Sequence, residues 1–451
     1  MLLNQIIIII SITFVTTRGL TEENDRYIIV LKDESTLQDI EEVISMIEKQ
    51  EQKEREMMEM KYVNNLIPMI SGRISVETVI KIAALPVVDY IEKDQPVHML
   101  PITDKNYNAS EWLINNSENV NGSTTRYNLD MINNPSNRCR NYRYKPPNDG
   151  TGVDIYIMDT GINYSHQDFK DSNGKTRAKY GGFEAVNPVN YGWDCQGHGS
   201  HCAGIAGGLA SGVAKGANLY SIRVLSCAGD GTTEGVVEAL DFIADLHKKK
   251  STRSNFVASI VSMSLGGGKS IAMNRAVNRL VSTGVVVVTA SGNDGADACL
   301  TSPGSAGLNI NVGAHSEPIL NSKVGCKNPI EAFSNWGSCV DVIAPGRDIK
   351  SVDYRNNYDF RLDSGTSMAC PHVAGAAAII MQSNRFLNPE QVKQKIVRDP
   401  EIKEDMKPLN LSERDLLPGG ITRQEYDKRL DRFTTEYAKA RDTLETVMQM
   451  R

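Results

Sequence analysis

The chain has 451 residues, of which 40 % are hydrophobic and 23 % charged, and its formal net charge is −6. This composition is ordinary for a globular protein: it excludes a collagen-like or disordered chain and gives no reason to expect nucleic acid as a partner. The one long apolar run lies at the N-terminus, so a protein with several membrane spans is also excluded.

That run, Leu2 to Val15, predicts a signal peptide. It is shorter than the ~20 residues that a membrane-spanning helix needs, and small and polar residues follow it through Gly19. We expect residues 1–19 to be removed and the mature protein to be secreted, with no membrane span left. An uncleaved N-terminal anchor is the alternative.

Residues 20–100 predict a small α+β domain. Apolar alternation favours three strands, and helical spacing favours two helices between them. The strands are expected at 27–32, 69–75 and 87–92, and the helices at 37–60 and 76–84. Residues 101–126 are rich in Asn, Ser and Thr, which is typical of a linker, and we expect proteolytic processing there.

From residue 127 to 420 the pattern changes to apolar strands alternating with helices. Strands are expected at 153–158, 217–224, 257–263 and 284–289, and helices at 232–246 and 273–282. Near-continuous apolar strands alternating with helices predict an α/β domain whose mainly parallel sheet is buried on both faces.

Residues 421–451 predict a helical tail. Apolar side chains recur there at alternating spacings of four and three, at Tyr426, Leu430, Phe433, Tyr437, Ala440, Leu444 and Val447. Such a seam either docks on the chain's own domain or self-associates as a coiled coil.

Three short motifs mark the candidate site in the α/β domain. Asp159-Thr-Gly161 follows a predicted strand, and the Gly-rich segments 197–204 and 365–375 each open a predicted helix. Singly, each is explained as a turn or a helix cap. Together they offer the carboxylate, imidazole and hydroxyl that nucleophilic catalysis by serine requires, in the chain order Asp, His, Ser known from subtilisin.

These motifs make the chain resemble the secreted subtilases, in particular their proteinase K-like branch. The resemblance covers roughly residues 127–400, and residues 26–100 resemble the family's inhibitory prodomain. It implies a subtilisin-like three-layer α/β catalytic domain, preceded by an α+β prodomain that blocks the cleft as an intramolecular inhibitor. The mature N-terminus is then expected between Met99 and Arg126.

The same resemblance implies a serine endopeptidase that acts on proteins or peptides through an acyl-enzyme and processes itself from a zymogen. Asp159 would orient His198, His198 would act as general base and then general acid, and Ser367 would attack the peptide carbonyl. In the motif Ala290-Ser-Gly-Asn-Asp294, Asn293 would donate its side-chain N–H to the oxyanion.

Substrate binding is expected along Ser264, Leu265 and Gly266. In the family this edge pairs with the extended substrate and lines the pocket for the residue before the scissile bond. Small residues there leave room for a large apolar side chain, which favours a broad specificity with apolar preference. Residues 229–231 could supply the opposite edge, or residues 226–232 could be a flexible loop.

Eight cysteines fit an oxidising compartment, as do N-glycosylation sequons at Asn108, Asn115, Asn121, Asn163 and Asn410. The resemblance implies the disulfides Cys195–Cys227 and Cys299–Cys339 and a buried free thiol at Cys202. Cys139 and Cys326 could pair or stay free, and Cys370 stands where the family generally has Thr.

We expect no cofactor and assign no metal, with a structural calcium left as an alternative. The calcium site common among proteinase K-like enzymes uses a carboxylate after a Val-Gly-Ala turn, and here the turn continues with His315 and Ser316. A metal site built from His201, Cys202 and Cys370 is the alternative.

Two other functions remain open from the sequence. Some secreted subtilases cut themselves once, keep the prodomain and act as binding proteins. A catalytically inactive scaffold is the second alternative.

Overall fold

The computed structural model describes residues 25–53, 58–100, 128–129, 144, 146–186, 190–317, 319–321, 325–327, 330–397, 416–417 and 421–422. The described residues form two compact units, divided between Asp94 and Gln95. The predicted signal peptide, the linker 101–126 and the heptad pattern from Tyr426 lie outside the described residues. No helix in the described part of the chain is long and apolar enough to span a membrane.

The first unit is an antiparallel sheet covered by two helices. Its strand order is β2 (Lys61–Val63), β3 (Met69–Arg73), β1 (Arg26–Leu31), β4 (Val88–Lys93), with α2 (Leu37–Glu51) and α3 (Val76–Ala83). The apolar face of α2, formed by Ile40, Val43, Ile44 and Ile47, is buried in its core. The α+β prediction is therefore confirmed.

Helix α2 is shorter than the predicted 37–60. Thr36 and Asp39 form a capping box at its start, and Gln52 ends it with a left-handed backbone at φ 54°. The charged composition of the following residues suits a helix, but α2 ends at Glu51 and the next element of the structure is β2.

The second unit is built on a seven-stranded parallel sheet. Its order is β17 (Val342–Pro345), β14 (Ile310–His315), β12 (Val286–Ala290), β10 (Ala258–Met263), β6 (Val153–Asp159), β8 (Asn218–Arg223), β7 (Ala178–Glu184). Strands β6, β10 and β12 lie at its centre and are buried throughout. The predicted parallel α/β fold is confirmed.

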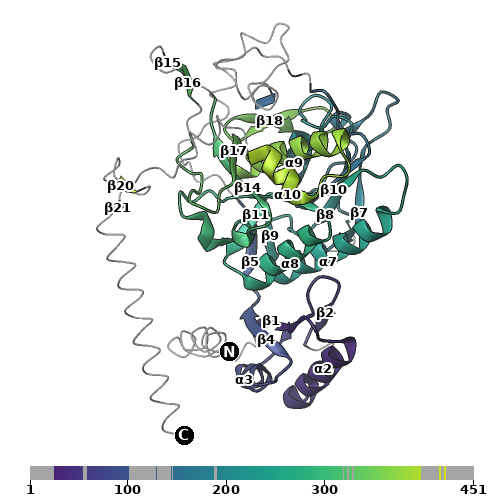
Figure 1. Cartoon of the computed structure of the whole chain (residues 1–451), viewed down its shortest axis with the longest axis vertical. Helices are drawn as coiled ribbons and strands as arrows, with labels where there is room; N and C mark the ends of the chain where they lie inside the picture. The colour runs from purple at the N-terminus through teal and green to yellow at the C-terminus, as the bar shows by residue number, and fades with distance from the viewer. Residues whose placement is uncertain are drawn as a thin grey trace. The chain divides into compact units, whose positions relative to one another are not determined.

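Helices cover both faces of this sheet (Figure 1). α7 (Thr233–Lys250) and α8 (Ile271–Ser282) lie together on one face, and α9 (Thr366–Ser383) packs across the central strands on the other. α6 (His198–Gly207) packs against α9, and so does α10 (Pro389–Val397), which follows α9 in the chain. The result is a three-layer domain whose core lies between the sheet and the helices α6 and α9.

A second sheet lies at the carboxyl ends of the parallel strands. Its order is β13 (Thr301–Ser302), β11 (Leu265–Gly268), β5 (Pro96–Met99), β9 (Asp230–Thr232). β5 comes from the end of the predicted small domain, residues 20–100, and belongs to the second unit. Three short antiparallel pairs complete the described structure: β15 (Ile319–Asn321) with β16 (Gly325–Lys327), β18 (Ile349–Val352) with β19 (Phe360–Asp363), and β20 (Leu416–Leu417) with β21 (Ile421–Thr422).

Candidate active site

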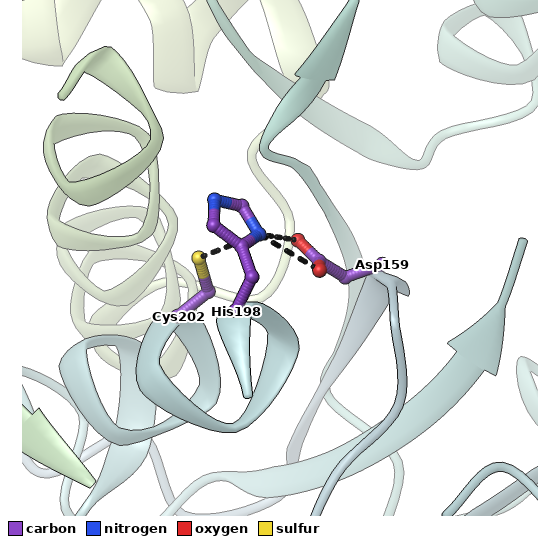
Figure 2. Close-up of side chains that lie close together, drawn as sticks. All are labelled: Asp159, His198 and Cys202. Carbon is purple, nitrogen blue, oxygen red and sulfur yellow. Dashed lines mark hydrogen bonds and ion pairs between the residues drawn. The ribbon is translucent and has the colours of Figure 1, made fainter. Parts of the chain in front are cut away.

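Asp159 and His198 form a buried, hydrogen-bonded pair. Asp159 ends the central strand β6, and His198 is the first residue of α6. Nδ1 of His198 lies 2.8 and 2.9 Å from the two carboxylate oxygens of Asp159, as Figure 2 shows. Because the carboxylate accepts a hydrogen bond, Nδ1 carries the proton, and the opposite ring nitrogen, Nε2, is left as the basic atom.

The turn before α6 fixes the position of His198. Gly197 has φ 107°, and a Cβ there would lie 2.3 Å from the ring of Tyr354. The carboxylate of Asp194 accepts hydrogen bonds from the backbone of this turn at Gln196 and Gly197, and from both N–H and Oγ of Ser200. Asp194 was not singled out from the sequence, because an acidic residue before a Gly-rich turn is a common cap.

Ser367 lies at the start of α9, directly after Gly365 and Thr366. Its Oγ donates to the backbone carbonyl of Ser264 at 3.2 Å, and Oγ of Ser264 donates to the carbonyl of Ser367 at 2.8 Å. Among the described residues, the buried Nε2 of His198 has no hydrogen-bond partner. Ser367 and His198 both lie at helix starts, but the hydroxyl of Ser367 is bonded to the carbonyl of Ser264 and not to His198.

Cys202 contacts both His198 and the backbone of Ser367. Its Sγ lies 4.0 Å from Nδ1 of His198 and donates to the carbonyl of Ser367 at 3.4 Å (Figure 2). The side chain is fully buried between α6 and α9. The thiol thus packs against both the base and the nucleophile's backbone without facing solvent.

The pKa of His198 reflects two opposing effects. Burial lowers it, but the charge and hydrogen bond of Asp159 outweigh burial, and the pKa of His198 lies well above its ordinary value. Burial raises the pKa of the Cys202 thiol, so the negative charge beside the imidazole is that of Asp159.

Asn293 lies on the loop after β12 and points toward a peptide carbonyl. Its Oδ1 accepts from the backbone N–H of Thr366 at 2.9 Å and from Oγ1 of Thr366 at 2.8 Å. These two bonds identify Nδ2 as the outward atom, and Nδ2 donates to the carbonyl of Leu100 at 3.0 Å. The geometry is that of an oxyanion-hole donor bound to a peptide group.

The peptide in question is the chain's own strand β5. It lies between β11 and β9 and pairs antiparallel with both, so that His98 is opposite Gly266 on one side and Asp230 on the other. The backbone N–H of Met99 donates to the carbonyl of Gly229 at 2.9 Å. β11 and residues 229–232 thus flank this extended strand on its two sides.

Two side chains of this segment are held in apolar surroundings. Val97 is fully buried, and Leu100 packs against the main core of the catalytic unit. A Cβ added at Gly266 would lie 3.2 Å from Cδ2 of Leu100. The absence of a side chain at Gly266 therefore makes the space that Leu100 occupies.

Four cysteines form two disulfides, Cys195–Cys227 and Cys299–Cys339, as the resemblance implied. The first covalently joins the turn before His198 to the turn before β9. Cys202 and Cys370 are free and buried. Burial raises the pKa of Cys370 to about 12, and its Sγ donates to the carbonyl of Val288.

A metal site at His201, Cys202 and Cys370 is not formed. Within the described ranges, the one group of three potential ligands whose atoms lie within 4.8 Å of one another is Asp159, His198 and Cys202, the pair and thiol already described. His201 instead lies against the carbonyl of Arg361, at 3.3 Å from Nε2. In the turn at 312–316, His315 is buried and its Nδ1 lies 2.7 Å from the carbonyl of Ser316.

The sequon at Asn163 has its asparagine inside the folded protein. Asn163 is buried, and its Nδ2 donates to the carbonyls of Tyr354 and Asn356 and to Oδ1 of Asn357. A glycan cannot be attached to this amide in the folded protein. The sequons at Asn108, Asn115, Asn121 and Asn410, and the side chains of Cys139 and Cys326, lie outside the described residues.

Two protein-family models match this sequence, and they correspond broadly to the two units of the fold. The model of the subtilase family matches residues 150–416, and that of the peptidase inhibitor I9 family matches residues 26–100. The first match alone covers more than half of the chain, which therefore belongs to the subtilase family, with an I9-type inhibitor domain before the catalytic domain.

Individual relatives are serine proteases. The chain is 40 % identical over 314 residues to alkaline serine exoprotease A of Vibrio alginolyticus, covering 69 % of this chain and 51 % of the relative. It is 41 % identical over 250 residues to an extracellular serine proteinase of Thermus sp., covering 55 % of each chain. It is also 41 % identical over 256 residues to a cuticle-degrading serine protease of Arthrobotrys oligospora, covering 56 % of this chain and 58 % of the relative. The chain spans about half the length of these curated relatives.

A solved structure gives the same result for the fold. The crystal structure of a cold-adapted subtilisin-like serine proteinase superposes with a TM-score of 0.51 at 40 % sequence identity. The superposition covers 60 % of this chain and 90 % of that chain.

Proposed function

We propose that this chain is a secreted serine endopeptidase, made as a zymogen, that hydrolyses peptide bonds through an acyl-enzyme on Ser367. The observation that carries the proposal is the bound strand: the carbonyl of Leu100 accepts a hydrogen bond from Asn293 while its backbone pairs with β11 and β9. A peptide held in this way presents a carbonyl carbon to the start of α9, where Ser367 lies.

The reaction begins when the hydroxyl of Ser367 leaves the carbonyl of Ser264 and donates to Nε2 of His198. His198 takes the proton, and Oγ of Ser367 forms a bond to the carbonyl carbon. The oxygen becomes an oxyanion that accepts from Nδ2 of Asn293 and, as we expect, from the backbone N–H of Ser367.

Collapse of this intermediate breaks the C–N bond. His198 gives its proton to the leaving amine, and Asp159 stabilises the imidazolium between the two transfers. In the second half, a water molecule gives a proton to His198 and its oxygen bonds to the acyl carbon. The bond between that carbon and Oγ of Ser367 then breaks, His198 returns the proton to Oγ, and the carboxylic acid product leaves. No metal or cofactor takes part in these steps.

Broad specificity with a preference for apolar side chains follows from the groove. Backbone pairing along β11 and β9 holds any extended peptide, while the space beside Gly266 accepts a side chain of the size of Leu100. Secretion is supported by the extracellular relative and by the two disulfides.

The test is cleavage of a blocked peptide, Val-His-Met-Leu followed by a fluorogenic amine, by the purified secreted protein. We expect wild type to release the amine after Leu, and His198→Ala to be slower by at least about 10³-fold, as for loss of one member of a triad. A His198→Ala protein that cleaves at the wild-type rate would refute the assignment.

The binding-protein alternative has one observation in its favour: residues 95–100 fill the groove in this structure. A protein that keeps this strand after secretion would bind partners through another surface and cleave no added peptide. Co-purification of an intact or nicked small domain, together with no amine release, would favour this alternative.

A further inference from the structure

We infer that Asp230 makes the cleft selective for a cationic side chain at the third residue before the scissile bond. The inference rests on the proposed function and adds a determinant to the same groove. It comes from the way in which the chain's own segment occupies the cleft.

The carbonyl bound by Asn293 sets the position of each residue of the segment relative to the scissile bond. Since the carbonyl of Leu100 lies at Nδ2 of Asn293, Leu100 is the first residue before the scissile bond, Met99 the second and His98 the third. Val97, the fourth, is fully buried, whereas His98 is exposed, as alternation along a strand requires. The third side chain therefore points out of the groove, beside the edge formed by β9.

At that edge, His98 meets a carboxylate. Nδ1 of His98 lies 2.9 Å from Oδ1 of Asp230, the residue directly opposite it in the register of β5 and β9. In the described part of the chain, this is the one ion pair of Asp230 that the structure contains. When the strand leaves, the carboxylate is left for a substrate side chain at the same position.

Asp230 is held in place before any substrate binds. The backbone N–H of Ser226 donates to the carbonyl of Asp230 at 2.8 Å, and the disulfide at Cys227 anchors the turn between them. Gly229 takes φ 88° in this turn, and a Cβ there would lie 2.9 Å from the side chain of Met99. The backbone that carries the Asp230 side chain is thus fixed at this register position, and the carboxylate can contribute to selectivity without ordering a loop.

The expected effect is modest because the pair is exposed. The two side chains keep 50 % and 60 % of their surface accessible, and exposed ion pairs contribute little in water. We expect a Lys over Gln preference of about 1.4- to fivefold in kcat/KM, and a larger Lys over Glu preference because Glu is repelled.

The experiment uses blocked fluorogenic peptides Val-X-Met-Leu with X as Lys, Gln or Glu, cleaved by the full secreted protein. Wild type should follow the order Lys, Gln, Glu; Asp230→Asn should bring the Lys to Gln ratio to about one; and Asp230→Lys should reverse the order. Asp245→Asn, which removes the same charge from an exposed pair with Lys249 on α7, is the matched control and should retain the wild-type order.

A peptide with X as His gives an independent readout. Its rate relative to the Gln peptide should exceed one at pH 5.5 and fall to one by pH 8, because a free imidazole loses its proton near pH 6.5. Taking the ratio at each pH cancels the titration of the enzyme's own groups, and 1 M salt should reduce the excess.

The outcomes separate this inference from the proposed function. If the peptides are cleaved but Asp230→Asn and Asp230→Lys keep the wild-type order, the inference is wrong and the endopeptidase assignment stands. If no peptide is cleaved and Ser367 cannot be labelled by a fluorophosphonate, the proposed function is wrong, and the inference fails with it.

Discussion

Replacement of Asn293 by aspartate tests the proposed oxyanion-hole donor while it keeps the acceptor that holds this side chain in place. In the structure, Oδ1 of Asn293 accepts from the backbone and hydroxyl of Thr366, and Nδ2 donates to the carbonyl of Leu100. An aspartate at this position would keep an acceptor for Thr366 and lose the donor. Asn293→Leu, of similar size, loses both.

The magnitudes follow from these contacts. Loss of the donor is expected to cost about 10²–10³ in kcat, which is the range known for the equivalent side chain of subtilisin. Loss of the acceptor leaves two buried donors of Thr366 unpaired, which costs roughly 1–3 kcal/mol of stability for each group. Asn293→Leu should therefore be both inactive and less stable, and Asn293→Asp mainly inactive.

The assay is steady-state cleavage of the fluorogenic peptide Val-His-Met-Leu, together with urea unfolding of each variant. We expect kcat to fall with little change in KM, because the donor strengthens its bond only as the oxyanion forms. An Asn293→Asp protein that is folded and loses less than about tenfold in kcat would show that this side chain is not the oxyanion donor.

Three further predictions concern the pocket, the processing site and the dependence on pH. Gly266→Val places a branched side chain where even a Cβ would lie 3.2 Å from Leu100. The kcat/KM for cleavage after Leu should therefore fall by roughly 10- to 200-fold, while that for cleavage after Ala is kept. An unchanged Leu to Ala ratio of kcat/KM would show that Gly266 does not line the pocket. We expect processing after Leu100 to be slow, because the residue that follows in the sequence is Pro101 and its ring carbon Cδ crowds the backbone of the preceding residue. Pro101→Ala should therefore speed cleavage at this bond, measured by intact mass, and a wild-type protein that starts at Pro101 as fast as the variant starts at Ala would refute this. Burial lowers the pKa of three histidines from 6.5, to about 4 for His201, about 4 for His315 and about 3 for His372. Between pH 6.5 and 4 these side chains bind protons only when unfolded, so the free energy of unfolding should fall by about 1.4 kcal/mol per pH unit for each as the pH drops; equal urea midpoints at pH 7 and pH 5 for an inactive variant would contradict it.

Much of the fold could be predicted because its signals are local. The strand expected at 153–158 is observed at Val153–Asp159, and that at 284–289 is observed at Val286–Ala290. Continuous apolar residues predict a strand that is buried on both faces, and the strands of a parallel sheet covered by helices are buried in this way. The motifs at strand and helix ends could be found for the same reason, since each is contiguous in the sequence.

Features that depend on distant contacts could not be predicted. Val88–Lys93 and Pro96–Met99 look like one interrupted strand, yet the first pairs with β1 and the second with β9 and β11, whose edges are remote in the sequence. The same is true of Asp194, whose carboxylate also accepts from Oγ1 of Thr160 on another loop. The residue that positions the base is recognisable only after the chain has folded.

The most direct test of the central claim compares wild type with Ser367→Ala, both expressed as the full chain and treated with a serine-reactive fluorophosphonate. We predict that wild type is labelled on Ser367 and is secreted without its small N-terminal domain, whereas Ser367→Ala is unlabelled and retains that domain. Intact mass and peptide mapping measure both properties in one sample. Labelling of Ser367→Ala equal to that of wild type, or loss of the domain from both proteins at the same rate, would contradict a self-processing endopeptidase that acts through Ser367.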